Sequence, residues 1–182
     1  MTAIIIIAVI LLIILWFISV QRNLVNADEL CRNSMSQIGV QQASRWDALT
    51  ALVDLVKSYN EHEYNTLRDV ISQRANITAT SSAKDADAQE DILTGALSKI
   101  IAVAENYPEL KANENYGKAM DSVNTYENQV RMSRMVYNDS VTRFNRLIRQ
   151  IPSNIVAGML GFTQKDYLQV SDAKTEMPSM KI

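Results

Sequence analysis

The apolar positions form two patterns, an unbroken run at the N-terminus and a helical repeat after it. Residues 3–18 contain no polar side chain. With Ser19 and Val20 the run covers about 18 residues, roughly 27 Å as a helix, which is close to the thickness of a hydrocarbon core. Trp16 and Phe17 lie near one end, where aromatic rings meet lipid headgroups. The pattern predicts a transmembrane anchor over residues 1–20.

The alternative for this run is a cleaved signal peptide. That needs a basic start, a shorter apolar core and a small-x-small cleavage site. No Lys or Arg precedes the run, and WFISVQRN is a poor cleavage site. We therefore expect an uncleaved, single-pass anchor in the lipid bilayer. Arg22 follows the span, which favours the bundle domain on the cytoplasmic side.

Beyond the span, apolar residues recur at alternating steps of three and four, as on one face of a bundle helix. The first predicted helix starts near Leu24 and covers about 50 residues, provided that it does not break at Thr50. Its stripe consists of Leu49, Val53, Val56, Asn60, Glu63, Leu67, Val70 and Arg74. A polar loop at residues 78–89 leads into a second helix over residues 87–107. Pro108 ends that helix because proline lacks an amide hydrogen.

A third long helix is predicted over residues 113–150, ending before Pro152. Residues 154–162 form a short apolar helix or turn that packs back on the bundle, and the tail 171–182 has the composition of a disordered segment. The expected fold is all-α: an N-terminal transmembrane helix followed by an antiparallel bundle of three long helices plus a short fourth, over residues 21–170. With short loops the three long helices run up, down and up.

The composition narrows the function classes. The chain has 182 residues, with 5 Gly and 3 Pro, and so few helix breakers favour a nearly all-helical chain. The net charge is −2 and basic residues are not massed in one segment, so we expect no nucleic-acid partner. Cys31 is the only cysteine, which excludes an intrachain disulfide and favours a small buried thiol.

Six sequence blocks stand in a recognisable order: MSQIGVQ, LVDLVKSYNEHEYNTL, ENYPELKANENY, YEN with Arg134, YND and IPSNIVAGMLGF. Together they resemble the LemA family of membrane-anchored helical proteins. MSQIGVQ is similar to the family's W-S-Q-I-D-V-Q, and LVDLVKSYNEHEYNTL is similar to L-V-x-x-V-K-x-Y-x-x-H-E-x-x-T-L. ENYPELKANENY resembles its most recognisable loop. YEN with Arg134, YND and IPSNIVAGMLGF resemble the remaining blocks, in the family's order. The resemblance covers about residues 20 to 170.

The resemblance implies a helical bundle behind an N-terminal anchor and no established catalytic activity. It also implies a gene neighbourhood with an HtpX-like membrane peptidase, which points to envelope stress or quality control. One departure affects the fold. The family's R-R-x-D-L-I-P-N-L-V corresponds here to SRWDALTALV, in which Thr50 replaces the proline, so a helix break at that point is in question.

Candidate catalytic chemistry centres on His62, the only histidine, which with Glu63 opens a zinc-protease motif. A zinc-binding helix needs a second histidine four residues later, and Thr66 occupies that position. No G-x-S-x-G nucleophile motif, G-x-G-x-x-G motif or Walker loop is present. We therefore predict a non-enzymatic protein without catalytic, metal or cofactor residues.

Charged residues interrupt the predicted core stripes at Glu63, Arg74, Glu127 and Arg134. One hypothesis is a buried ionic layer in which each carboxylate pairs with an arginine and fixes helix register. The alternative is that these side chains reach solvent along their aliphatic stems. The Tyr107–Pro108 turn with Asn113 is interpreted as a helix–helix connector, with Asn113 or Asn115 capping the next helix.

Helix lengths predict self-association. The second helix is too short to cover both neighbours, which leaves apolar residues of the first helix without a partner and marks an interface. These residues are Leu24, Leu30, Met35, Ile38 and Trp46. The sequence therefore predicts a membrane-anchored, self-assembling scaffold and homo-oligomer of the bacterial envelope. The alternative is a regulatory adaptor that binds another membrane protein, such as the HtpX-like peptidase.

Overall fold

The computed structural model describes residues 1–169, and the predicted disordered tail lies outside them. Six helices follow one another in this part of the chain, and it contains no strand. Their bounds are α1 Thr2–Val56, α2 Glu61–Ile71, α3 Ala83–Asn106, α4 Pro108–Lys111, α5 Glu114–Arg149 and α6 Ser153–Met159. The all-helical prediction is confirmed. Only residues 160–169 follow α6 in the described chain, without helix.

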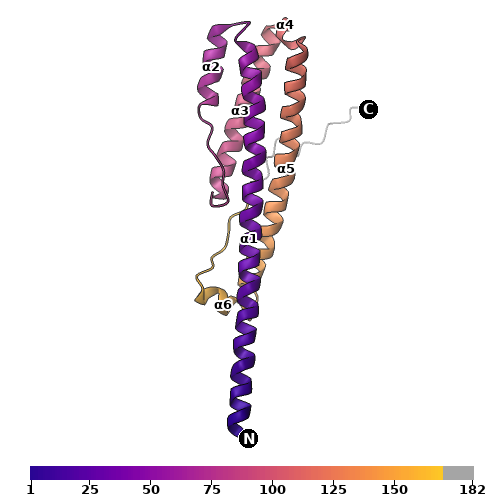
Figure 1. The fold of residues 1–182 in the computed structure, drawn as a ribbon. Coiled ribbons are helices and arrows are strands. Elements are labelled where there is room, and N and C mark those ends of the chain that lie inside the picture. Colours follow the sequence, from indigo (N-terminus) through magenta and orange to yellow (C-terminus); the bar gives the residue numbers. More distant parts are fainter. Residues whose placement is uncertain (170–182) are drawn as a thin grey trace, which may run out of the picture.

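Helix α1 is continuous over 55 residues, about 80 Å, and its N-terminal third projects beyond the other helices (Figure 1). It does not break at Thr50, whose hydroxyl donates to the carbonyl of Trp46 at 2.8 Å within the helix. The break comes at residues 57–60 instead. Asn60 adopts an extended conformation, and its side chain accepts hydrogen bonds from the backbone of His62 and Glu63, which starts α2.

The prediction of a single first helix that continues to Arg74 is therefore wrong. The predicted up, down and up order of the three long helices is wrong as well. Helix α2 turns back beside α1, and residues 72–82 continue in the same direction without regular structure (Figure 1). Helix α3 consequently runs parallel to α1, and α5 runs antiparallel to both. A capping box between Ser82 and Asp85 fixes the start of α3.

The predicted connector joins α3 to α5 across the short helix α4. Pro108 is in the first turn of α4, and the Asn113 side chain caps α5 by accepting from the backbone of Asn115. The connector also contacts the α1–α2 turn: Asn60 donates to the Tyr107 hydroxyl, and Asn113 donates to the Tyr59 hydroxyl at 3.3 Å. These contacts link the two turns at the end of the molecule far from the N-terminus.

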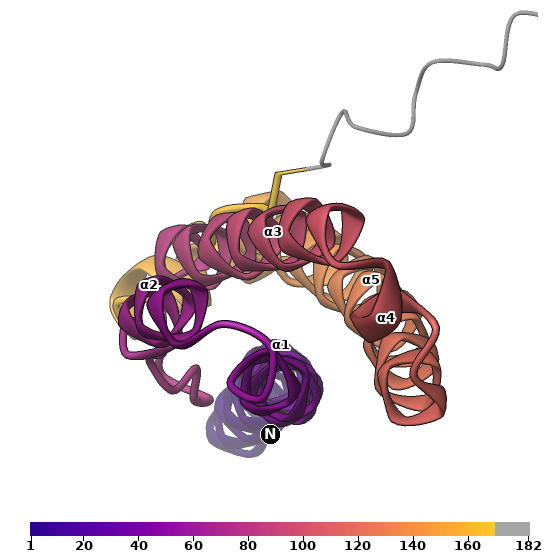
Figure 2. The same ribbon diagram turned by 90° about the horizontal axis from the view of Figure 1, so that it is seen from above.

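Two apolar clusters form the core. A lower cluster joins α1 around Leu24 to Ile38 with the C-terminal half of α5 and with Val156 and Ala157 of α6. An upper cluster joins α1 from Trp46 onward with α2, α3, α4 and the start of α5. Helices α2, α3 and α5 form an arc around one side of α1 (Figure 2). Between the clusters, α1 contributes buried Gln42 and Arg45 instead of apolar residues.

The apolar residues of α1 that were predicted to lack a partner and to form an interface are mostly buried in this packing. Leu24, Met35 and Ile38 lie in the lower cluster and Trp46 in the upper one, each at most 2% exposed. Only Leu30 is exposed, at 52%. The sequence argument failed because it placed the third long helix in the wrong direction. Helix α5 runs back toward the N-terminal end of α1 and packs against Leu24, Met35 and Ile38.

Candidate functional site

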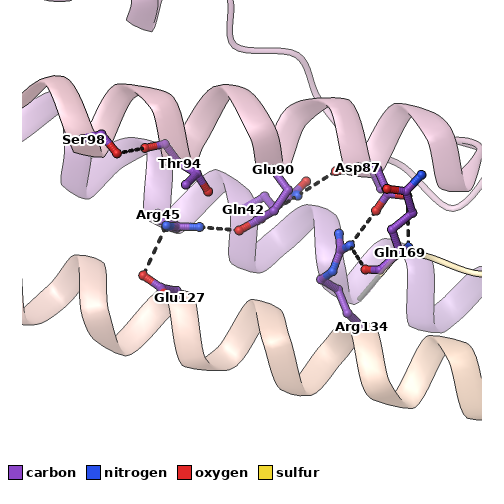
Figure 3. Close-up of polar contacts among 10 residues, drawn as sticks. Gln42, Arg45, Asp87, Glu90, Thr94, Ser98, Glu127, Arg134 and Gln169 are labelled. Atoms are coloured by element: carbon purple, nitrogen blue, oxygen red, sulfur yellow. Dashed lines mark hydrogen bonds and ion pairs between the residues drawn. The ribbon is translucent and has the colours of Figure 1, made fainter. Parts of the chain in front are cut away.

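Arg45 is the centre of a polar layer between the two apolar clusters. Its side chain is 1% exposed and lies between α1, α3 and α5 (Figure 3). Nη1 donates to Glu90 Oε1 at 2.6 Å, and Nη2 donates to Glu127 Oε2 at 3.4 Å. A buried guanidinium requires such partners, because removing it from water costs several kcal/mol, on the order of the attraction it regains. The pairing therefore joins α1, α3 and α5 through one buried side chain.

Gln42 extends the layer by one helical turn. Its Nε2 donates to the carbonyl of Ala86 and to Glu90 Oε2, both at 3.2 Å. Within residues 1–169, Gln42 Oε1, Arg45 Nε and Trp46 Nε1 are buried and make no hydrogen bond. Unsatisfied buried polar atoms reduce stability. The polar layer is thus incompletely satisfied, and its net contribution to the free energy of unfolding is small.

A second ionic group lies on the lower side of the layer. Arg134 Nη2 of α5 pairs with Asp87 Oδ1 of α3 at 2.5 Å and donates to the carbonyl of Gln169 at 2.7 Å (Figure 3). Asp87 Oδ2 accepts from the backbone amide of Gln169 at 3.2 Å. The pair therefore joins α3, α5 and the chain that follows α6.

The ionic-layer hypothesis fits two of its four residues. Glu127 and Arg134 lie in the polar region, but they pair with Arg45 and Asp87 rather than with each other. Arg74 does not belong to it, because it is exposed and pairs at 2.6 Å with Asp47, itself 70% exposed. Glu63 is half-buried in the first turn of α2. The cause is the chain reversal at Asn60, which moves α2 away from α5.

Sequence reasoning missed Gln42, Arg45, Asp87 and Glu90. A signal for the first two was present, since Ile38, Gln42, Arg45 and Leu49 continue the three-and-four spacing of buried positions. No comparable signal marked the acids of α3. Both lie on a helix start that reads as an ordinary polar segment.

Two asparagines of α5 hold the extended chain over residues 163–169. Asn145 donates to the carbonyl of Lys165 and accepts from its amide, both at 2.9 Å. Asn138, seven residues earlier, does the same with Leu168 at 3.1 and 2.9 Å. The Tyr137 hydroxyl donates to the carbonyl of Asp166 at 3.2 Å. The YND block noted in the sequence thus fastens this C-terminal segment to the bundle.

His62 and Cys31, the residues considered for catalysis or metal binding, lie in different parts of the molecule. His62 is exposed, whereas Cys31 is 1% exposed in the lower cluster, and burial raises the pKa of its thiol. Residues 1–169 contain no group of three His, Cys, Asp or Glu side chains that could hold a metal ion. The charged groups of the polar layer pair with one another across helices.

The N-terminal part of α1 is the remaining candidate site. It is long and apolar enough to cross a membrane, and none of its most apolar stretch is buried. Its exposed side chains include Ile4, Leu12 and Leu15. This apolar stretch is about as long as a membrane span and continues directly into the folded part of the chain. The structure is therefore a helical bundle attached to one long apolar helix.

Comparison with known proteins gives the family. The LemA family pattern matches residues 34–182, so the chain belongs to the LemA family. This family is not a known enzyme family. Magnetosome proteins MamQ 1 and MamQ 2 of Paramagnetospirillum magneticum are each 31% identical to the chain over 78 residues. That match covers 43% of this chain and 29% of each relative's length.

Proposed function

We propose that the protein is a membrane-anchored, non-enzymatic scaffold whose bundle holds protein-binding surfaces at a fixed distance from the bilayer. The observation that carries the proposal is the continuity of α1. The same helix forms the candidate membrane span and the central column of both core clusters. No flexible linker separates the two, so the position of the bundle follows that of the span.

Scaffolding requires a surface for other chains, and we assign it to exposed apolar residues at the α1–α5 edge. Met132, Met135 and Val136 are 60%, 60% and 48% exposed and follow helical spacing on α5. Ser34 and Ser140 contact each other at 3.2 Å across the two helices. Leu30 and Val136 each lie one turn before one of these serines, and so flank the same contact.

The occupant we propose for this surface is a second copy of the chain, since the anchor concentrates and aligns copies in one plane. Sizing of the full chain in mild detergent tests it. The expected result is a homomeric particle that Val136→Glu reduces to single chains. Ser98→Glu adds the same charge on an exposed position of α3 and should leave the particle intact.

A single-chain species in the unsubstituted protein would contradict self-assembly. It would favour the adaptor function, in which the same edge binds a different membrane protein. Cys31 is unsuitable for cross-linking copies because its thiol is buried. An engineered cysteine at Leu30, which is exposed, provides the cross-link instead. Formation of a dimer through that position would support a symmetric contact between copies.

A further inference from the structure

Helix α6 lies at the end of the bundle from which the apolar part of α1 emerges (Figure 1). Val156 and Ala157 on one side of α6 are 1% exposed and belong to the lower core cluster. Phe17 and Val20, at the end of the candidate membrane span, pack against the same cluster. The level of α6 along α1 is therefore that of the boundary between span and bundle.

The other side of α6 is apolar and uncovered. Ile155 and Met159 are 60% and 72% exposed and lie one turn apart. Ile151 before the helix is 83% exposed, and Leu160 after it is 44% exposed. Four exposed large apolar side chains within the ten residues 151–160 are an unusual concentration for a stretch facing water.

The two chain segments nearest the apolar part of α1 carry only basic charged residues. Residues 1–27 and 140–165 contain no Asp or Glu, although the whole chain has 20 of them. The same two segments contain Arg22, Arg143, Arg146, Arg149 and Lys165. The four arginines are exposed, whereas Lys165 pairs with Asp28 at 2.8 Å. Cations beside exposed apolar residues match a bilayer surface that carries anionic headgroups.

We propose that α6 and its flanking residues form a second membrane contact, which inserts Ile155 and Met159 at the headgroup boundary while the arginines bind anionic lipid. The occupant is a lipid surface because the exposed apolar residues of α6 lie at the level where the apolar part of α1 leaves the bundle, with exposed arginines on the adjacent end of α5. This inference rests on the proposed anchoring. The contact restrains the tilt of the bundle and its rotation about the axis of α1, which a single span leaves less restricted.

An environment-sensitive fluorophore and a quencher attached to lipid test the contact. The full chain, with Cys31→Ala, is labelled at Ile155→Cys or Met159→Cys and reconstituted in vesicles with and without phosphatidylglycerol. Val40→Cys is the matched control. It is 59% exposed on α1, but about 30 Å along the helix from Val20. Flotation of the vesicles reports anchoring, and circular dichroism reports folding.

The expected result is loss of fluorescence to the lipid quencher at Ile155 and Met159 and not at Val40. The loss should be smaller without phosphatidylglycerol and in Arg146→Gln/Arg149→Gln. Floating protein with equal, weak quenching at all three positions would overturn the second contact while leaving the anchor in place. Folded protein that fails to float would overturn the anchoring, and the second contact with it.

Discussion

The polar layer shows how a single buried residue affects the whole bundle. Arg45 contributes little net stability, because its desolvation offsets much of the attraction to Glu90 and Glu127. Removing one partner is different, since it strands the buried guanidinium. The two carboxylates are not equivalent. Glu90 is closer to Arg45 and 17% exposed, whereas Glu127 is 32% exposed.

Glu90→Ala should therefore lower the free energy of unfolding by about 3 kcal/mol or more, as for other broken buried pairs. Glu127→Ala should cost less, and the double substitution should cost less than the sum because both act through Arg45. Denaturant unfolding in detergent measures these differences. Lys118→Ala is the control, since it breaks an exposed pair with Glu114 worth under about 1 kcal/mol. Equal losses for Glu90→Ala and Lys118→Ala would refute the layer.

Gly39 provides a second prediction for a single residue. A Cβ atom at this position would lie 2.0 Å from the backbone oxygen of Ile77, because residues 72–82 cross α1 there. Gly39→Ala should destabilise the protein by about 1–3 kcal/mol, as overpacking does. Gly117→Ala on α5 meets no atom within 4 Å. It should stabilise by roughly 0.5–1 kcal/mol through helix propensity.

Thermal melts of the two glycine variants, followed by circular dichroism, give the comparison. Opposite signs are the expected outcome. If both variants melt at or above the temperature of the unsubstituted protein, residues 72–82 do not pack on α1 as the structure has them.

Among the elements, the extended C-terminal segment depends most on named side chains. Asn138→Ala and Asn145→Ala each remove two hydrogen bonds to its backbone. Each loss should cost roughly 1–3 kcal/mol, since backbone groups of the segment lose their partners. The amides of Lys165 and Leu168 should then exchange with solvent faster while α1 stays protected. Asn128→Ala on the exposed side of α5 should leave that exchange unchanged. Slow exchange in all three variants would contradict this role for the asparagines.

Periodicity predicted most helices but not where the first one ends. The apolar run, α3, α5 and α6 were found because apolar spacing or a proline marks each of them. The reversal at Asn60 was missed because the three-and-four spacing passes through it unchanged. A capping asparagine acts through its backbone conformation, to which a hydrophobic pattern is insensitive.

The polar contacts were only partly predictable for a related reason. The sequence indicated Glu127 and Arg134 as members of a polar layer, because they are charged residues at predicted core positions. Their partners depend on which helices are neighbours, and that order follows from the reversal at Asn60. The extended segment over residues 163–169 has no period at all. Its position comes from asparagines on α5, whose role becomes visible only when the two parts of the chain lie side by side.

At the scale of the whole molecule, the features are ordered along α1. The apolar span comes first, then the cationic end with α6, the lower cluster, the polar layer and the upper cluster. Both core clusters include residues of this one helix. The bundle should therefore fold without the span, because its first core residue on α1, Leu24, follows the apolar run.

Removing residues 1–20 tests this division. The shortened chain should move from the membrane to the soluble fraction, since about 18 apolar residues that hold the helix in lipid are lost. Its helix content per residue and unfolding transition should remain close to those of the full chain, because both core clusters are retained apart from Phe17 and Val20 at the edge of the lower one. Any remaining vesicle binding should need anionic lipid and weaken with salt, as expected for a contact made by α6 and its arginines. A folded, shortened chain that stays in the membrane fraction at high salt would show that the apolar end of α1 is not the main attachment.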